Sequence, residues 1–404
     1  MTARSPALIT SSLSLGLILG QLAIMAVPAL SVDLAALWQL DATDLGWLGG
    51  IYFAGYALAL PFLAGAANRT DGRIVYAVCA LTNAVASLCV PLFGDGFWWL
   101  LVLRFAAGVG FAGVHIIGMK LLADRLSGNA QARASAVYTT AFAIGSGCSF
   151  LIAGLLANSF GWQAAFVAAG LGSLLSIPLL FLIGPPLAEN ESRSTRLFPD
   201  FLAALRNPEI RRYVIAYGGN IWEVFAVRVW FVPILTFSAA YNSVSESTWD
   251  PTIIAGLSVF VSVPLNLVIA ELGIRFGRRV VILTVSVASI VVCGILGWQA
   301  SGPYLVVLLL LLIHSITSFG DVGAIAGGIV AAASGETRAA ALTLFGLVGF
   351  AFGFLGSLAV GLVVDLAGGR GEPGAWLWAF AVIAVGSVIS GAAMAWGPRL
   401  TLRR

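Results

Sequence analysis

Long runs of apolar residues alternate with short polar breaks along the whole chain. A helix needs about 20 apolar residues to cross the hydrocarbon core of a bilayer, where its backbone amides must be hydrogen-bonded within the segment. Breaks at Gly, Pro, Asp and Arg predict twelve membrane-spanning helices, with boundaries uncertain by about four residues. These are residues 10–34, 43–67, 74–93, 97–122, 132–158, 162–184, 213–238, 251–273, 280–299, 303–332, 337–366 and 374–396.

The composition agrees with an all-α membrane protein. Of the 404 residues, 60% are hydrophobic and 10% are charged, whereas a soluble domain has about 25% charged residues. The net charge of +3 is too small to indicate nucleic-acid binding. The four cysteines lie in apolar runs without a CxxC pair, so we expect neither a disulfide framework, nor a metal site, nor a cofactor.

The basic residues predict the orientation of the spans. If the N-terminus is cytoplasmic, eighteen of the 21 basic residues fall in inner connections, and Arg370 alone lies outside. The other two, Arg104 and Arg228, lie within spans. We therefore expect a bacterial inner-membrane protein with both termini in the cytoplasm. The polar stretch 185–212 is the predicted cytoplasmic linker between residues 1–184 and 213–404.

The two parts of the chain resemble each other in sequence. Arg69-Thr-Asp-Gly-Arg73 follows the second span, as Arg275-Phe-Gly-Arg-Arg279 follows the eighth. Arg133-Ala-Ser-Ala precedes the fifth span, as Arg338-Ala-Ala-Ala precedes the eleventh. A duplicated six-helix unit predicts two pseudo-symmetric bundles, with a solute site between them near the middle of the membrane.

These motifs resemble those of the major facilitator superfamily over essentially the whole chain. Residues 68–73, Asn-Arg-Thr-Asp-Gly-Arg, are a degenerate form of its signature loop, and the second copy has Ile274 in place of the acidic residue. Arg104-x3-Gly108-x-Gly110 is similar to its fourth-helix pattern. The fifth span lacks the Gly-Pro motif of the family's drug/proton antiporters. The resemblance implies alternating access, with gating ion pairs or topology signals at Arg69, Asp71, Arg73, Arg275, Arg278 and Arg279.

Six ionisable residues lie deep in the predicted spans, although a charge at the bilayer centre costs at least about 2.5–3.5 kcal/mol. They are Arg104, His115, Glu223, Arg228, His314 and Asp321. All six lie on the fourth, seventh and tenth spans, and the family resemblance implies that these helices line the central cavity together with the first. Helical spacing puts Arg104 and His115 on one face, and His314 and Asp321 on another.

These positions suggest roles in binding and coupling. Glu223 and Asp321 are the deep carboxylates, and either is a candidate for carrying a coupling proton because burial disfavours its charged form. Arg104 and Arg228 are candidates for holding an anionic solute. The other candidates for substrate binding are His115, His314, Asn220, Trp222, Tyr138, Tyr52 and Trp230.

Structural roles are open for the same residues. The arginines and carboxylates balance and could form ion pairs that lock helices together, although Glu223 and Arg228 are about 140° apart on their helix. Arg104 could serve helix packing, and the histidines could be hydrogen-bonded packing residues.

The sequence therefore predicts a monomeric secondary transporter that moves a small polar, anionic solute with protons. An exporter of amphiphilic compounds is the alternative within this class, and a membrane sensor or scaffold is the alternative outside it. We do not expect an enzyme, because no nucleophile with a base and an orienting partner can be argued.

Overall fold

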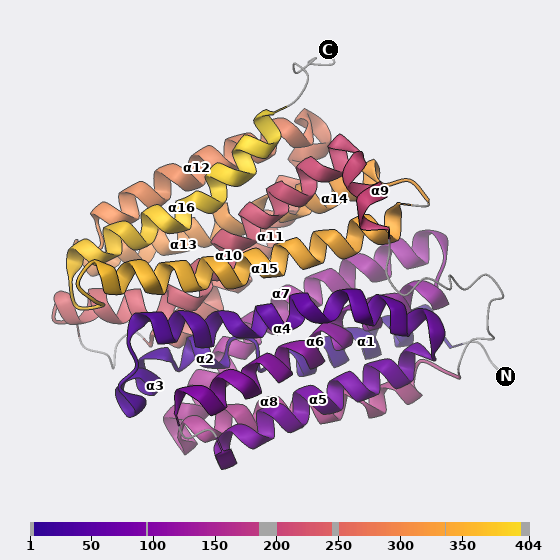
Figure 1. The fold of residues 1–404 in the computed structure, drawn as a ribbon, viewed down its shortest axis with the longest axis horizontal. Coiled ribbons are helices and arrows are strands. Elements are labelled where there is room, and N and C mark those ends of the chain that lie inside the picture. The colour runs from indigo at the N-terminus through magenta and orange to yellow at the C-terminus, as the bar shows by residue number, and fades with distance from the viewer. Residues whose placement is uncertain (1–3, 94–95, 186–199, 245–249, 336, 397–404) are drawn as a thin grey trace.

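The computed structural model of the chain describes residues 4–93, 96–185, 200–244, 250–335 and 337–396, without the side chains of Ala64, Ala67 and Asn68. These residues form sixteen α-helices and one 3-10 helix, and no strand occurs among them. The helices run roughly along one direction in two bundles, which lie one above the other (Figure 1). Eleven helical stretches are long and apolar enough to cross a membrane, and two of them, Trp162–Phe181 and Tyr304–Ala332, each combine two of these elements.

The N-terminal half is the lower bundle in Figure 1. It consists of α1 (Pro6–Gly20), α2 (Ala26–Ala29), α3 (Ser31–Trp38), α4 (Ala42–Arg69), α5 (Gly72–Phe93), α6 (Phe97–Arg125), α7 (Gly128–Phe160), α8 (Trp162–Ser176) and η1 (Pro178–Phe181).

The C-terminal half is the upper bundle. It consists of α9 (Phe201–Arg206), α10 (Pro208–Tyr241), α11 (Pro251–Phe276), α12 (Arg278–Trp298), α13 (Tyr304–Gly320), α14 (Val322–Ala332), α15 (Arg338–Leu366) and α16 (Pro373–Ala395). Helix α10 begins at Pro208, so part of the predicted linker is helical. Linker residues 186–199 lie outside the described residues.

The first predicted span is not one continuous helix. Residues 21–25 form turns between α1 and α2. The Gln21 side chain donates to the Phe142 carbonyl at 2.5 Å, and the Met25 amide donates to the Ser149 hydroxyl at 3.0 Å. Ser149 in turn donates to the Leu22 carbonyl at 2.6 Å. Side chains and carbonyls of α7 therefore replace the hydrogen bonds that the interrupted helix loses.

The tenth predicted span is also interrupted, because Asp321 separates α13 from α14. The Asn266 amide of α11 donates to the two carbonyls before Asp321, at 2.7 and 3.1 Å. An interruption at this depth is stable only where neighbouring groups satisfy the freed backbone. The apolar run alone did not predict either break.

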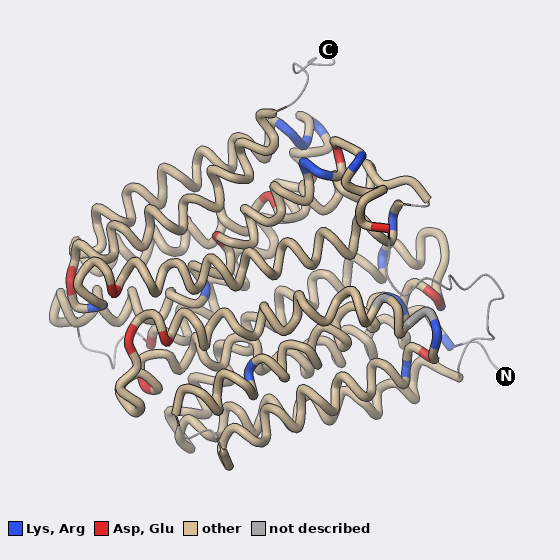
Figure 2. Tube along the Cα trace, viewed as in Figure 1, with Lys and Arg blue, Asp and Glu red and all other residues tan. Residues whose placement is uncertain are grey.

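The two ends of the bundle differ in charge. We call the end with the described N-terminal residues and the segments that flank the linker the linker end, on the right in Figure 1, and the opposite end the far end. Lys and Arg gather at the linker end, whereas Asp and Glu dominate the far end (Figure 2). The described charged residues of the far end are Asp33 in α3, Asp41 and Asp44 at the start of α4, Asp250 before α11, Asp365 near the end of α15, and Arg370 and Glu372 before α16. This asymmetry matches the predicted distribution of charge.

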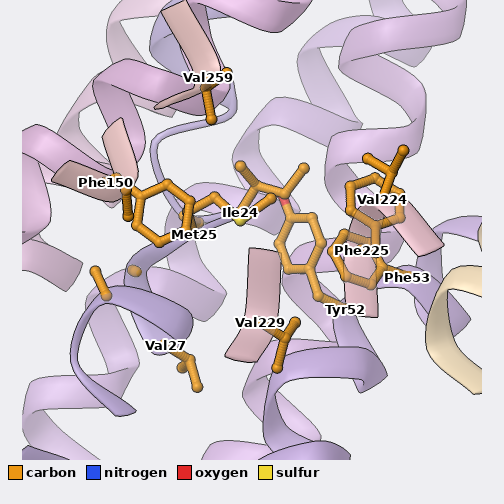
Figure 3. Packing of buried hydrophobic residues seen from close by; sticks show 14 of the residues in the cluster. Ile24, Met25, Val27, Tyr52, Phe53, Phe150, Val224, Phe225, Val229 and Val259 are labelled. Carbon is orange, nitrogen blue, oxygen red and sulfur yellow. The ribbon is translucent and has the colours of Figure 1, made fainter. Parts of the chain in front are cut away.

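Aromatic stacking joins the two halves. Phe53 of α4 stacks on Phe225 of α10 with ring centroids 3.9 Å apart (Figure 3). Nearer the linker end, Tyr56 of α4 stacks on Phe350 of α15 at 3.7 Å. All four rings are at most 4% exposed. These stacks close the boundary between the halves at mid-depth.

Candidate functional site

Glu223 on α10 lies in a buried polar cluster inside the C-terminal half. Its Oε1 is 2.9 Å from Nε2 of His314 on α13 and accepts a hydrogen bond from the Ser289 hydroxyl on α12. Its Oε2 accepts from the Ser387 hydroxyl on α16. Cys293 Sγ lies 3.0 Å from the same His314 nitrogen. Four helices of the C-terminal half thus contribute to this cluster. The sequence instead predicted that Glu223 and His314 face a cavity between the halves.

Asp321 has a different environment, directly after the end of α13 and about two turns beyond His314. The Asn220 amide donates to Oδ1 of Asp321 at 2.7 Å and to the Ser318 carbonyl at 2.8 Å. Asn220 and Asp321 are 3% and 2% exposed. Helix α10 therefore has two polar contacts with α13 and the break that follows it. Asn220 forms an amide–carboxylate contact with Asp321, and Glu223 forms a carboxylate–imidazole contact with His314.

Arg228 is a buried cation without a protein anion among the described residues. Its guanidinium carbon lies 5.1 Å from the centre of the Phe319 ring, and the residue is 7% exposed. Within the described parts of the chain, no side chain or carbonyl forms a hydrogen bond or ion pair with it. A buried guanidinium without a counter-charge has a high desolvation cost. Binding of an anionic ligand at this position would offset part of that cost.

Arg104 has its nitrogens occupied by backbone groups. Its guanidinium donates to the carbonyls of Ala23 and Ile24 in the interruption of the first span, the second at 3.2 Å, and Nε donates to the Leu48 carbonyl at 3.4 Å. The Tyr52 ring lies 4.6 Å from the guanidinium carbon. This geometry supports the alternative of helix packing more strongly than solute binding.

His115 lies in an aromatic enclosure beside the boundary between the halves. Its Nδ1 is 2.7 Å from the Tyr56 hydroxyl, and the rings of Phe111, Tyr138 and Phe142 surround it with centroid distances of 4.7–6.2 Å. The Tyr56 hydroxyl has no other hydrogen-bond partner among the described residues, and either atom of this contact can be the donor. Nε2 of the ring has no protein partner among the described residues.

The other candidate binding residues have packing contacts. The Tyr138 hydroxyl donates to the His115 carbonyl at 2.9 Å. The indoles of Trp222 and Trp230 donate to the carbonyls of Val382 and Ser357 at 2.9 and 3.0 Å. The Tyr52 hydroxyl is buried without a described partner. Contact of these residues with a solute stays a prediction.

The deep charges do not neutralise one another in pairs. Among the described residues, neither Arg104 nor Arg228 forms an ion pair with Glu223 or Asp321. This agrees with the predicted angle between Glu223 and Arg228 and leaves both buried arginines without a counter-charge. Backbone carbonyls accept from Arg104, whereas Arg228 has no hydrogen-bond acceptor among the described residues.

The signature loop binds within its own half. Asp71 pairs with Arg73 at 2.9 Å, and Arg73 donates to the Gly184 carbonyl at 2.9 Å. Burial alone would raise the pKa of Asp71, but the hydrogen bonds and charge of Arg73, with the charge of Arg125, outweigh it and hold this pKa below its usual value. Arg69 ends α4, and the Asn68 side chain lies outside the described residues.

The second copy of the loop also has local contacts. Arg275 pairs with Glu271 at 3.1 Å, and Arg279 donates to the Ala395 carbonyl at 2.6 Å. The Arg278 guanidinium lies against Gly327 of α14. A gating role for either copy stays a prediction.

The far end contains contacts between the halves that the sequence analysis missed. The Asp365 carboxylate of α15 accepts from the backbone amides of Ala42 and Thr43 at 3.1 and 2.6 Å, at the start of α4. Asn158 of α7 donates to Asp250 at 2.9 Å, just before α11. Burial tends to raise the pKa of Asp250, but hydrogen bonds from Thr252, Ile253 and Asn158 outweigh it and lower this pKa. These contacts close the far end.

Two of the residues missed by sequence reasoning share one signal. Gln21 and Asn266 are single amide side chains within apolar runs, and each lies where a helix is interrupted. A buried amide needs hydrogen-bond partners, so its position was informative. Ser289, Ser387 and Asp365 gave no comparable signal, because serines are common in spans and an acidic residue at a helix end is ordinary.

Two interrupted spans, long apolar helices in two bundles and a buried polar centre define a multi-pass membrane transporter. The family model of the Major Facilitator Superfamily matches residues 12–253. The chain therefore belongs to the major facilitator superfamily, whose members are transporters and not enzymes.

Individual relatives are distant. The chain is similar to the niacin transporter NiaP of Acinetobacter baylyi, with 27% identity over 137 residues, which cover 34% of this chain and 31% of that protein. It is also similar to a hexuronate transporter of Bacillus subtilis, with 25% identity, covering 69% of this chain and 68% of that one. The first match thus spans about a third of the relative's length.

A solved structure agrees with the fold over nearly the whole chain. It is that of a bacterial homologue of the human lysosomal transporter Spinster, in an inward-facing and occupied conformation. The two chains superpose with a TM-score of 0.75 and 16% identity, covering 96% of this chain and 95% of that one. At this identity the likeness establishes the fold alone.

Proposed function

We propose that this protein moves a small organic anion together with protons across the bacterial inner membrane by alternating access. The observation that carries the proposal is the arrangement of the buried charges. Arg228 has no protein anion, whereas Glu223 lies against a titratable imidazole. A solute anion would supply the missing counter-charge, and a proton would neutralise the carboxylate.

The Arg228 guanidinium is the proposed anchor for the solute. It stays protonated at any physiological pH and presents donors that match the two oxygens of a carboxylate. The Phe319 ring beside it provides an apolar surface. A solute that combines a carboxylate with an apolar or planar body fits these neighbours. The similarity to niacin and hexuronate transporters supports an acidic solute without specifying one.

The Glu223–His314 pair is the proposed carrier of the coupling proton. When one proton is shared between Oε1 and Nε2, the pair has no net charge. This holds both for a carboxylic acid beside a neutral imidazole and for a carboxylate beside an imidazolium. Loss of that proton leaves one buried negative charge, held by the Ser289 and Ser387 hydroxyls. The proton is therefore bound or released at a defined atom pair, and its transfer changes the charge inside the bundle by one.

The proposed direction of opening rests on the charges and the contacts at the two ends of the bundle. The positive-inside rule assigns the linker end to the cytoplasm. The contacts of Asp365 and of Asp250 close the far end between the halves. We therefore infer a conformation closed toward the outside, in which the halves must separate at the far end to complete a transport cycle.

Uptake into proteoliposomes tests the proposal. Purified protein should accumulate nicotinate, benzoate or glucuronate when the outside is more acidic, and not the uncharged nicotinamide. Arg228→Gln should reduce this uptake at least about tenfold, the effect of losing one charge-assisted contact. Arg133→Gln, at an exposed position of α7, is the matched control and should retain it. Equal uptake by wild type and Arg228→Gln would exclude the anion site.

Export of amphiphilic cations is the second candidate function, and one observation favours it. A cavity of about 230 Å³ at the far end lies between the halves and is lined by Asp33 and Asp250, with no basic residue among its described lining residues. Such a vestibule attracts cations. Transport of a cationic dye that persists after Arg228→Gln would favour this function over anion uptake.

A further inference from the structure

Three side chains of metal-binding type converge inside the C-terminal half. Glu223 of α10, Cys293 of α12 and His314 of α13 are each at most 1% exposed. Nε2 of His314 lies 2.9 Å from Oε1 of Glu223 and 3.0 Å from Sγ of Cys293. The same sulfur lies 3.9 Å from Oε1. Carboxylate oxygen, thiolate sulfur and imidazole nitrogen are the atoms that bind zinc in proteins. The proposed proton carrier uses the carboxylate and the imidazole and leaves the thiol without a role.

The three separations fit a single metal ion. A circle through three atoms at these separations has a radius of about 2.0 Å, close to the length of Zn–N and Zn–O bonds. The Zn–S bond is longer, at about 2.3 Å, so the thiol side chain would have to move back by only a few tenths of an ångström. One ion near the centre of the triangle can therefore contact all three atoms without a rearrangement of the helices.

The charges of the three ligands match a divalent ion. With one proton on the Glu223–His314 pair and a protonated thiol, the empty cluster has no net charge. Zn²⁺ bound by a carboxylate, a thiolate and a neutral imidazole also gives no net charge. Binding releases two protons to the solvent for each ion bound, as metal ligation requires, and it buries no additional net charge in the membrane interior. The two anionic ligands would not be balanced by a monovalent ion.

The groups around the ligands indicate a reversible site. The Ser289 hydroxyl donates to Oε1 of Glu223 and the Ser387 hydroxyl to Oε2, and such hydrogen bonds orient a carboxylate that ligates a metal. Nδ1 of His314 has no hydrogen-bond partner among the described residues. The lack of this second partner typically lowers metal affinity by about 10–100-fold. We therefore expect EDTA to remove the ion from the folded protein.

We propose that Glu223, Cys293 and His314 form a Zn²⁺ site inside the C-terminal half, and that Zn²⁺ bound there inhibits transport. The ion takes the place of the proton between Oε1 and Nε2, and it connects α10, α12 and α13. The binding site is independent of the solute, whereas the inhibition rests on the proposed function of this pair as the proton carrier. The sequence predicts no metal site because no CxxC pair is present, but these ligands are 21–91 residues apart.

Co²⁺ is a coloured probe for such a site. The protein, without an affinity tag, is incubated with Co²⁺ long enough for local opening to expose the buried ligands. Wild type should show the visible bands of four-coordinate Co²⁺ and a near-ultraviolet thiolate-to-cobalt band, at about one ion per chain, and Zn²⁺ should remove both. Cys293→Ser should lose the thiolate band. Cys79→Ser is the matched control, because Cys79 is also buried but lies on α5 in the other half, and it should keep the spectrum.

Thermal unfolding and uptake separate the binding site from the inhibition. Zn²⁺ should raise the Tm of wild type and of Cys79→Ser but not of Cys293→Ser, because a ligand that binds only the folded state stabilises it. After incubation with Zn²⁺, proton-driven uptake into proteoliposomes should be lost, and EDTA should restore it. Any uptake by Cys293→Ser, whatever its rate, should not respond to Zn²⁺.

Each outcome bears on one part of the proposal. A wild-type spectrum without the thiolate band, or a band that persists in Cys293→Ser, would overturn the site, and Cys293→Ala tests the same point if the serine variant does not fold. Proton-driven uptake without metal binding would leave the proposed function standing. A confirmed site whose occupation leaves uptake unchanged would instead overturn the inhibition and the assignment of Glu223 and His314 as the proton carrier.

Discussion

The carboxylate of Glu223 and the imidazole of His314 lie 2.9 Å apart with neither side chain more than 1% exposed. They come from α10 and α13, and Asn220 and Asp321 connect the same helix to the following break at 2.7 Å. Two ionisable contacts therefore cross one helix–helix interface. A change of charge in either contact acts on the same packing surface, and we propose that proton binding at Glu223 is coupled to movement of α13 through this surface.

Glu223→Gln tests the proton carrier. The amide preserves the size of the side chain but cannot bind and release the proton, so uptake driven by a pH gradient should fall at least about tenfold. Exchange of labelled for unlabelled solute, which needs no net proton movement, should persist. Ser387→Ala removes one hydrogen bond from the carboxylate and should retain proton-driven uptake. Full activity of Glu223→Gln would reject the assignment.

Substitution of Arg104 tests whether this residue stabilises the fold or binds the solute. Its replacement by Gln leaves the carbonyls of Ala23 and Ile24 without their donor at the break of the first span. Hydrogen bonds to charged groups contribute about 1.5–3 kcal/mol each, so we expect a markedly lower Tm and poor yield of folded protein. Arg104→Lys should recover part of the stability.

The alternative role of Arg104 predicts a different result. If it binds solute, Arg104→Gln should fold with an unchanged Tm and show a raised KM. Tm and KM measured on the same preparation separate the two roles.

The helices could be predicted from sequence because lipid imposes a minimum length and forbids unpaired backbone groups. Twelve apolar runs were expected, and eleven helices meet the criteria for a span. The breaks at Gln21 and Asp321 could not be predicted, since they depend on Ser149 of α7 and Asn266 of α11, distant in sequence.

The sequence predicts which ionisable residues lie deep in the membrane, but not which residues they contact. Six deep ionisable residues are visible in the sequence because charges in apolar runs are rare. Their partners are not visible, because helical spacing gives the face of a helix but not the helix that meets it. Glu223 and His314 are 91 residues apart, and the serines that complete the cluster look like any others in a span.

His115 and Tyr56 give a prediction about a tautomer. If the Tyr56 hydroxyl donates to Nδ1, 2.7 Å away, the neutral ring carries its proton on Nε2. If this N–H binds solute, His115→Gln, whose amide nitrogen reaches a similar position, should keep a near-normal KM, and His115→Asn should raise it about tenfold. Tyr56→Phe frees the tautomer and should raise KM to a smaller extent. Identical KM values for the two His115 variants would contradict this role.

Asp365 gives the sharpest test of how the far end opens. Its carboxylate accepts from two amides at the start of α4 and from the Thr43 hydroxyl at 2.6 Å, so it caps a helix of the opposite half. An anion at a helix N-terminus contributes about 0.3–2 kcal/mol. In Asp365→Asn an amide NH₂ faces the donors in place of one oxygen, and the closed far end should lose about tenfold in relative population.

The population of the open far end can be measured with a cysteine at position 236, which lines the far-end cavity. In a background without the four native cysteines, a membrane-impermeant maleimide added from outside should label Thr236→Cys faster when Asp365→Asn is present. Glu372→Gln removes a charge from the same end, where its side chain caps no helix, and should leave labelling unchanged. Equal labelling rates with and without Asp365→Asn would mean that this carboxylate does not hold the halves together.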